Sequence, residues 1–174
     1  MSDLPPATLP PVRRVVTGHD AAGKAVVISD ASFPGVPNPK GTAQFTLVWT
    51  SASAPADNDD PTDGRARDVD LTLPGGSVIR VVDMLPLTTA PMHRTSSLDY
   101  GIVIAGSIEL ILDDGVSTLV HPGEIVVQRG TIHSWRNPSA DVTARVAFVL
   151  LDAKPVTVGG RPMADIHPSA GLKP

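Results

Sequence analysis

Cysteine is absent from this chain of 174 residues. Its absence excludes disulfide scaffolds, zinc fingers, iron–sulfur clusters and any thiol nucleophile. A metal ion, if one is bound, must therefore be held by histidine, a carboxylate or backbone oxygen. A single domain of this length buries roughly 70% of its unfolded surface, so the fold needs neither a cross-link nor a structural metal.

Basic residues and long apolar runs are also scarce. The 14 Lys and Arg residues are outnumbered by 18 Asp and Glu residues, and the net charge of −4 offers no basic field to a nucleic acid. The longest apolar run, residues 146–151, is too short to span a membrane. The N-terminus lacks the basic and apolar regions of a signal peptide. We expect a soluble, cytoplasmic protein that binds neither nucleic acid nor membrane.

Glycine and proline, by contrast, are abundant. The chain has 15 Gly and 18 Pro residues, which break helices and punctuate turns. Apolar runs at 13–29 flank a glycine-bounded loop and predict a hairpin. Alternating segments predict further short strands, and no helix longer than one turn is indicated. These strands are expected at 42–50, 77–85, 99–105, 107–112, 117–121, 124–128, 133–136 and 142–151. The pattern predicts an all-β antiparallel barrel or sandwich.

The strands define one central domain with extended ends. Residues 1–12 contain four prolines and predict an extended arm, residues 13–152 the barrel domain, and residues 153–174 an irregular tail. Within the domain, residues 51–70 carry six acidic side chains and no apolar period, which indicates a solvated, flexible loop or a lid over a pocket. Their spacing does not reproduce a calcium-binding EF-hand.

Two segments carry the residues capable of chemistry. The first is HRTSSLDYGIVIAG at 93–106, and the second is HPGEIVVQRGTIHSWRN at 121–137. Strand alternation places His93 and Thr95 on one face, and Asp99 opens the next strand with its side chain free to turn inward. Two imidazoles and one carboxylate, here His93, His133 and Asp99, are the ligand type of non-haem Fe(II) centres, and Zn²⁺ or Mn²⁺ also fits. The alternative is a hydrogen-bonded network of the same side chains without metal.

The spacing of these segments resembles that of the cupin family over about residues 75–152. The family pattern His-x-His, three or four residues, Glu, six residues, Gly corresponds to His93-x-Thr95, Asp99 and Gly106. The pattern Gly, Pro-x-Gly-x-x-His, three residues, Asn corresponds to Gly123, Gln128-x-Gly130-x-x-His133 and Asn137. The resemblance implies a double-sheet jelly roll, a cupin-type antiparallel β-barrel that is usually dimeric, with a divalent metal at its open end.

Three positions depart from the family pattern. Thr95 replaces a motif histidine, Asp99 replaces the glutamate and Gln128 replaces the proline. A threonine hydroxyl is a weak neutral ligand, so the predicted metal ligands reduce to His93, Asp99 and His133. Aspartate is one methylene shorter than glutamate and reaches the same metal position only after a backbone shift or a displacement of the ion. We expect the change at Gln128 to be structural.

Residues around this set predict the lining of a substrate pocket. Trp135 lies two residues after His133 and should share its side of the strand, either as a pocket wall or as a core residue. Tyr100 and Thr95 are further substrate-binding candidates, although alternation turns Tyr100 away from Asp99. Arg80 can pair with a substrate carboxylate or lie on the wet face. The remaining histidines, His19, His121 and His167, are expected at the surface.

The function predicted from these features is a metal-dependent cupin enzyme that acts on a small organic molecule. The metal is Fe, Mn, Ni or Zn, with Asp99 as ligand or catalytic base, and oxygenase, isomerase, lyase and decarboxylase chemistry all remain open. The alternative function is a non-catalytic cupin module that binds a small molecule or a metal. Open sheet edges and the extended arm predict a homodimer.

Overall fold

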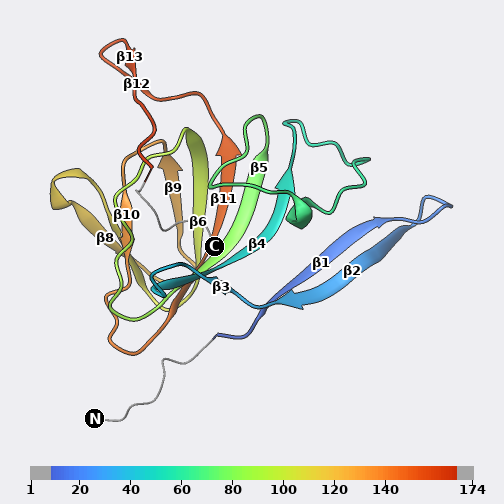
Figure 1. The fold of residues 1–174 in the computed structure, drawn as a ribbon, viewed down its shortest axis with the longest axis horizontal. Coiled ribbons are helices and arrows are strands. Elements are labelled where there is room, and N and C mark those ends of the chain that lie inside the picture. Colours follow the sequence, from blue (N-terminus) through green and yellow to red (C-terminus); the bar gives the residue numbers. More distant parts are fainter. Residues whose placement is uncertain (1–8, 168–174) are drawn as a thin grey trace.

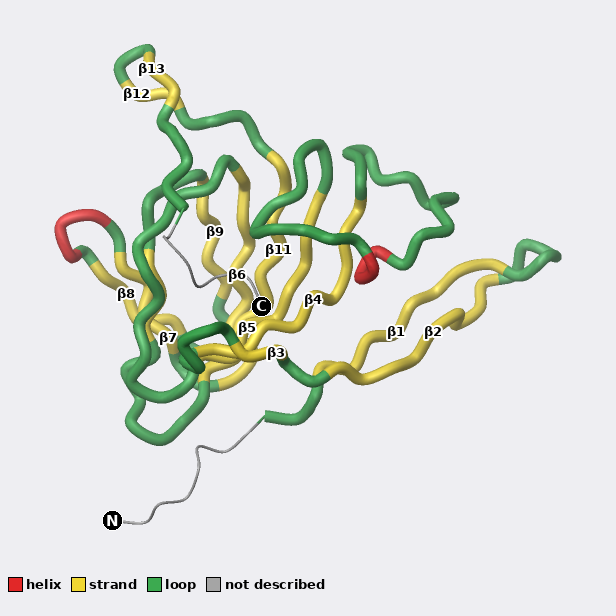
Figure 2. The backbone as a smooth tube through the Cα atoms, in the orientation of Figure 1, coloured by secondary structure: helices red, strands yellow, loops and turns green. Residues whose placement is uncertain are grey.

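The computed structural model describes residues 9–167 and consists of strands joined by loops and two short 3₁₀ turns (Figures 1 and 2). The first nine strands are β1 (Val12–His19), β2 (Ala25–Phe33), β3 (Val36–Pro37), β4 (Ala43–Ser51), β5 (Ser77–Met84), β6 (Ser97–Ala105), β7 (Ile108–Ile111), β8 (Ser117–Val120) and β9 (Ile125–Arg129). The last four are β10 (Ser134–Arg136), β11 (Ala144–Asp152), β12 (Thr157–Val158) and β13 (Arg161–Pro162). The 3₁₀ turns are η1 (Gly64–Ala66) and η2 (Asp113–Gly115).

Two antiparallel sheets form the body of the molecule. The larger has six strands in the order β3-β4-β5-β11-β6-β9, and the smaller has three in the order β10-β7-β8. The all-β jelly roll predicted from the sequence is confirmed, with the difference that the two sheets are not closed into a continuous barrel. The predicted strands all occur, with ends displaced by two residues or fewer.

The core lies between these sheets. Its buried apolar side chains come from strands of both sheets and include Phe45, Val82, Val103, Ile108 and Val146. Strand β6 shows how the sequence produces this arrangement, because buried and less buried residues alternate along most of its length. Alternating exposure is the pattern of a strand with one face on the core.

A hairpin of β1 and β2 projects from the body as a separate two-stranded sheet (Figure 1). The hairpin predicted at 13–29 is therefore confirmed, and it extends to Phe33. Its attachment to the body uses Arg14, whose guanidinium lies over the rings of Phe33 and Trp49 at 5.1 and 5.6 Å. Arg14 also makes two hydrogen bonds to the carboxylate of Asp63, at 2.6 and 2.8 Å.

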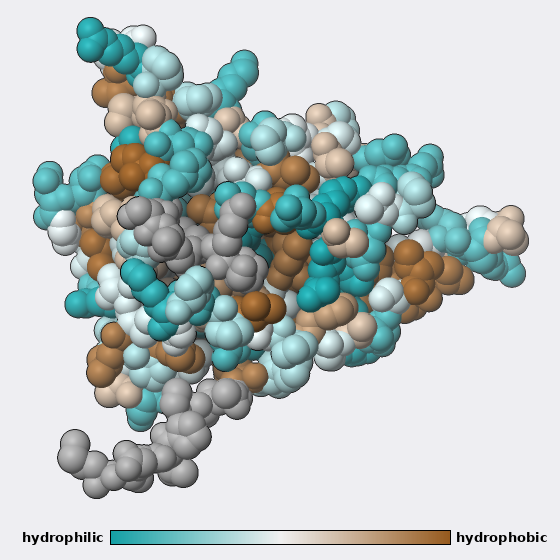
Figure 3. Space-filling view, in the orientation of Figure 1, coloured by the Kyte–Doolittle hydropathy of each residue, from teal (hydrophilic) through white to brown (hydrophobic). Residues whose placement is uncertain are grey.

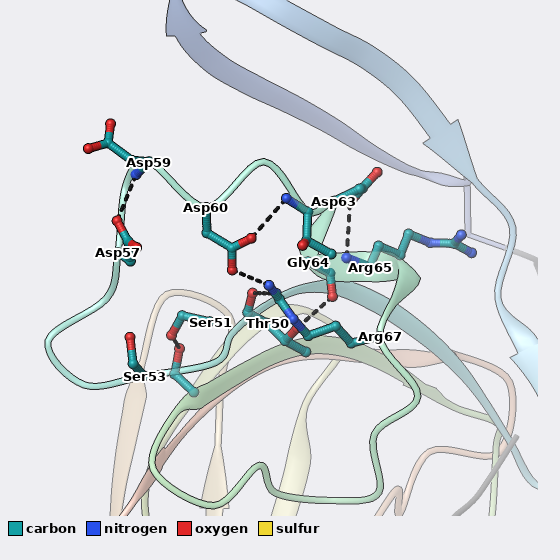
Figure 4. Close-up of polar contacts among 12 residues, drawn as sticks. Thr50, Ser51, Ser53, Asp57, Asp59, Asp60, Asp63, Gly64, Arg65 and Arg67 are labelled. Carbon is teal, nitrogen blue, oxygen red and sulfur yellow. Dashed lines mark hydrogen bonds and ion pairs between the residues drawn. The ribbon is translucent and has the colours of Figure 1, made fainter.

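The acidic segment predicted as a flexible loop or lid is held by specific contacts to β4 (Figure 4). The hydroxyl of Thr50 donates to the carbonyl of Gly64 at 2.6 Å, and Arg67 donates to the Thr50 carbonyl at 3.0 Å. Arg67 also pairs with Asp60. A glycine is needed at position 64, because a Cβ there would lie 2.4 Å from the carbonyl oxygen of Thr50.

The segment after β11 returns to the body of the molecule. Its β12–β13 hairpin is followed by an antiparallel bridge between Arg94 and Ile166. The tail predicted as irregular thus contains two short pairings, while residues 168–174 and most of the predicted arm at 1–12 lie outside the described residues. Among residues 9–167, no helix is long and apolar enough to cross a membrane.

Candidate functional site

A cavity of about 130 Å³ lies between the two sheets. Its walls combine inward-facing residues of β4, β5, β6, β9, β10 and β11 with residues of the loops at the open end of the sandwich. The polar residues of its lining are Asn38, Lys40, Thr42, Arg80, Thr89, His93, Thr95, Asp99, Gln128 and His133. The apolar and aromatic residues are Ala43, Phe45, Leu71, Val82, Met84, Ala90, Pro91, Trp135, Phe148 and Leu150.

His93 and His133 face each other across an isolated antiparallel bridge. Each backbone amide donates to the other residue's carbonyl at 2.9 Å, and the ring centroids are 4.2 Å apart. The Nδ1 atom of His93 lies 3.0 Å from the Pro91 carbonyl, and that of His133 lies 3.0 Å from the Thr131 carbonyl. A carbonyl oxygen only accepts, so each Nδ1 carries the ring proton and each Nε2 is left as an acceptor.

The environment of both imidazoles favours their neutral forms. Burial lowers the pKa of His133 to about 4, with a further contribution from the nearby ring of His93. Burial likewise lowers the pKa of His93, against a smaller opposing effect of the Pro91 carbonyl. Removing a cation from water is costly, which is why burial acts in this direction on a histidine. Both rings are therefore uncharged bases at neutral pH.

Asp99 lies on the inner face of β6 and is only 5% exposed. Burial raises the pKa of its carboxyl to about 6, although a hydrogen bond from Ser97 and the charge of Arg80 oppose the shift. The hydroxyl of Ser97 also lies 2.8 Å from that of Thr95. Since Ser97 donates to the carboxylate, Thr95 is the donor in that second contact, and its oxygen remains available as an acceptor.

Arg80 enters the cavity wall from β5 and is 7% exposed. Its Nη2 donates to the backbone carbonyls of Asp70 and Leu71, at 3.0 Å for the second contact. Burial lowers the pKa of the guanidinium to about 10, while the charges of Asp70 and Asp99 oppose that shift. Arg80 thus remains a cation at neutral pH, and it lies in the pocket rather than on the wet face.

Aromatic side chains close one side of the cavity. Trp135 contacts His133 and Phe148 edge to face, with centroid distances of 6.4 and 5.4 Å. Gly101 makes room for them, because a Cβ at this position would lie 3.1 Å from the Phe148 ring and 3.6 Å from that of Trp135. The expectation that Trp135 and His133 share one side is confirmed.

Six of the seven predicted site residues line this cavity: Arg80, His93, Thr95, Asp99, His133 and Trp135. Tyr100 does not, because it alternates with the inward-facing Asp99 and Gly101 and points to the other face of β6. Its role as a substrate-binding residue therefore has no support in the cavity geometry. His121 is exposed as expected, and its Nδ1 lies 3.0 Å from the hydroxyl of Ser107.

The predicted metal ligands come together only in part. His93 and His133 are adjacent, but within residues 9–167 no three His, Asp or Glu side chains group closely enough to hold a metal ion. Asp99 approaches the cavity from β6, whereas the two histidines lie on the bridge outside the named strands. The short aspartate side chain does not join the imidazoles, so the donor set does not fit the predicted three-ligand site. Among the described residues, the acidic loop likewise contains no group of three carboxylates that could hold a metal ion.

Several lining residues were missed by the sequence analysis. Gln128, expected to be structural, is 3% exposed and lies opposite Asp99 in the β6–β9 register. Its inward direction could have been predicted, because it lies two residues after Val126 and therefore on the same, core-facing side of β9. Asn38, Lys40 and Leu71 come from loops, where no periodicity indicates which side chains turn toward the cavity.

Comparison with known proteins identifies the family. The cupin domain family model matches residues 80–150. The chain is 40% identical over 157 residues to phomopsin biosynthesis cluster protein C' of Diaporthe leptostromiformis, covering 85% of this chain and 82% of that protein. It is 36% identical over 165 residues to the cupin-domain-containing oxidoreductase fogC of Aspergillus ruber, covering 91% of this chain and 81% of that protein.

Among solved structures, the chain is similar to the polyketide cyclase RemF from Streptomyces resistomycificus. The TM-score is 0.45 and the identity 21%, over 67% of each chain. The family match covers the strands that supply Arg80, Asp99, Gln128 and Phe148 to the cavity, and the full-length relatives extend the similarity to the rest of the fold. This chain therefore belongs to the cupin family.

Proposed function

We propose that this protein is an enzyme that acts on a small organic molecule held between its two sheets, and that the His93–His133 pair moves a proton on that molecule. The names of its relatives support an enzymatic role in a biosynthetic route. One relative is named a biosynthesis cluster protein and others are named cupin-domain-containing oxidoreductases. The cavity is the place in the described chain where polar side chains from many strands converge.

The observation that carries the proposal is the arrangement of the two imidazoles. Each ring is fixed by a hydrogen bond from Nδ1 to a backbone carbonyl, and each is neutral at physiological pH. A neutral, oriented imidazole at the edge of a cavity is suited to general base catalysis. Only one ring of a pair 4.2 Å apart can readily be charged, so the pair takes up a single proton and returns it.

Two further residues support this chemistry by charge and by hydrogen bonding. The Arg80 guanidinium stabilises negative charge that develops on the substrate when a proton leaves, since it is a buried cation in the same cavity wall. Its Nε has no partner and is free to bind a substrate oxygen, including a carboxylate. Asp99 holds the Ser97 hydroxyl and is assigned a binding role rather than the predicted role of base.

Proton transfer of this kind serves isomerases, lyases and decarboxylases alike. The oxygenase reading and the metal dependence predicted from the sequence both require a metal site. Because the described His, Asp and Glu side chains do not assemble three metal donors, we derive no step through a metal ion.

Metabolite profiling of the source organism tests the proposal. Strains carrying wild-type protein, His133→Gln or the surface variant His121→Gln are compared, and the compound that accumulates only with His133→Gln is isolated. Purified wild-type protein should convert this compound in D₂O with incorporation of deuterium. His133→Gln should be slower by roughly 10²–10⁴-fold, the usual contribution of a positioned acid or base. His121→Gln should match the wild type, since its side chain is exposed and outside the cavity.

Two results would contradict the proposal. Full activity of His133→Gln, or conversion without any exchange of hydrogen with the solvent, would remove the imidazole pair from the mechanism. A molecule that binds to the wild-type cavity and is released unchanged under all these conditions would favour the alternative of a non-catalytic binding module.

A further inference from the structure

Two buried polar side chains in the cavity wall take no part in the proton transfer proposed above. Asp99 of β6 and Gln128 of β9 lie directly opposite each other in the antiparallel register, and both line the cavity. They are 5% and 3% exposed. Residues opposite each other on adjacent strands project to the same face and lie side by side.

The free atoms of this pair are complementary. Oδ1 of Asp99 is a buried acceptor without a hydrogen-bond partner, and Nε2 of Gln128 is a buried donor without one. Leaving such groups unpaired is costly, and native proteins satisfy nearly all of them. A cavity wall with one free acceptor beside one free donor therefore suits a ligand that supplies a donor to the first and an acceptor to the second.

We propose that Asp99 and Gln128 together recognise a hydroxyl group of the substrate. The hydroxyl donates its hydrogen to Oδ1 of Asp99, and its oxygen accepts from Nε2 of Gln128. An ether or ketone lacks the donor, an ammonium group lacks the acceptor, and a carboxylate places a second anion beside Asp99. The inference rests on the proposed function in one respect, namely that the molecule recognised is the substrate of the same cavity.

The rest of the wall indicates what carries this hydroxyl. Trp135 and Phe148 form an aromatic side, and Val82, Met84 and Leu150 add aliphatic surface. Such a lining favours an apolar ring, which packs against the aromatic edges. The substrate class is therefore a hydroxylated ring compound, a phenol or a cyclic alcohol or enol, with an otherwise apolar body.

Fluorine NMR titration of the purified full-length protein tests this assignment with para-fluorophenol and para-fluorotoluene as probes. The two molecules differ only in that a hydroxyl replaces a methyl group. We expect the wild-type protein to bind the phenol at least roughly tenfold more tightly, the scale of one well-made buried hydrogen bond. In Gln128→Met the preference should fall by at least roughly threefold, because the donor is replaced by an apolar chain of similar length while the Asp99 acceptor remains.

Matched variants separate recognition from folding and from catalysis. Asp99→Asn presents an amide in place of the acceptor and should reduce the same preference, while Gln44→Met makes the chemical change of Gln128→Met outside the cavity and should leave it intact. The affinity for para-fluorotoluene should be similar in all variants that fold. Equal binding of both probes to the wild type, no binding of either, or a preference that is undiminished in Gln128→Met overturns the proposal. The readout is binding without turnover, so it fails or succeeds independently of the role assigned to the histidines.

Discussion

Three polar residues of the cavity lining are departures from the cupin motif. Thr95 has a hydroxyl where the family pattern has histidine, Gln128 has a polar amide where it has proline, and Asp99 is shorter than the usual glutamate. The hydroxyl of Thr95 lies 2.8 Å from that of Ser97, Gln128 adds a buried donor, and Asp99 adds a buried carboxylate acceptor. All three positions thus place hydrogen-bonding groups along the cavity wall.

The raised pKa of Asp99 makes a prediction for stability. A carboxyl with a pKa of about 6 in the folded protein and about 4 unfolded stabilises the fold below about pH 4, and this contribution is lost as the pH rises through about 6. Asp99→Asn removes the charge. The free energy of unfolding of this variant, measured relative to wild type, should therefore be roughly 2–3 kcal/mol more favourable to folding at about pH 8 than at about pH 4. Denaturant unfolding at both pH values measures this difference. The exposed control Asp113→Asn should show no such gain, and an identical offset at both pH values would refute the prediction.

Position 95 provides a test of metal binding. Thr95→His places a third imidazole at the edge of the cavity beside His93, where the family pattern has a histidine. Three nitrogen donors suit Zn²⁺, so the variant should bind it more tightly than the wild type in a competitive titration against a chelator. The surface control Thr118→His should not differ from the wild type. Unchanged Zn²⁺ affinity in a folded Thr95→His protein would show that residues 93 and 95 do not converge with His133.

At the scale of strands and loops, the sequence was informative wherever one face of a strand is buried. The alternation of polar and apolar residues located each strand of the body, because successive side chains of a strand point to opposite faces, as along β6. The register between strands does not follow from alternation within each strand, and the pairing of Asp99 with Gln128 could not be predicted for this reason. The contacts that hold the acidic loop could not be predicted either, because they are single hydrogen bonds and ion pairs to distant residues rather than a periodic pattern.

The attachment of this loop predicts the effect of one substitution on β4. Thr50 is 1% exposed and donates to the Gly64 carbonyl, so Thr50→Val keeps the shape and removes the bond. Chemical unfolding should show a loss of about 1–3 kcal/mol, and trypsin should cleave faster at Arg65 and Arg67. Thr46→Val is the matched control on the same strand and should change neither quantity much. Equal protease resistance of both variants would mean that the loop is held by its other contacts.

At the scale of the whole molecule, the β1–β2 hairpin exposes apolar side chains outside the body of the fold. Val27 and Ile28 are 60% and 62% exposed, and Figure 3 shows hydrophobic surface gathered over this hairpin. Isolated two-stranded ribbons with apolar residues on their surface are normally covered by another part of a protein. We propose that a second copy of the chain covers this hairpin in a homodimer.

Light scattering at micromolar concentration measures this assembly. The wild type should have twice the mass of one chain, and Ile28→Asp should shift the mass toward the monomer, because the charge would be buried in the interface. Ser32→Asp adds the same charge at an exposed polar position of the same strand and should remain dimeric. A monomeric wild type would refute the prediction.

The position of β11 in the larger sheet has a consequence for how the chain acquires its structure. This strand is the last long one in the sequence, yet it lies between β5 and β6 and pairs with both along most of its length. During synthesis β5 and β6 emerge first, with facing edges that have no partner until residues 144–152 follow. Contacts between segments so distant in sequence form slowly, and open edges favour aggregation. Nascent chains that stop before Ala144 should consequently depend on chaperones, whereas addition of a single strand completes the sheet.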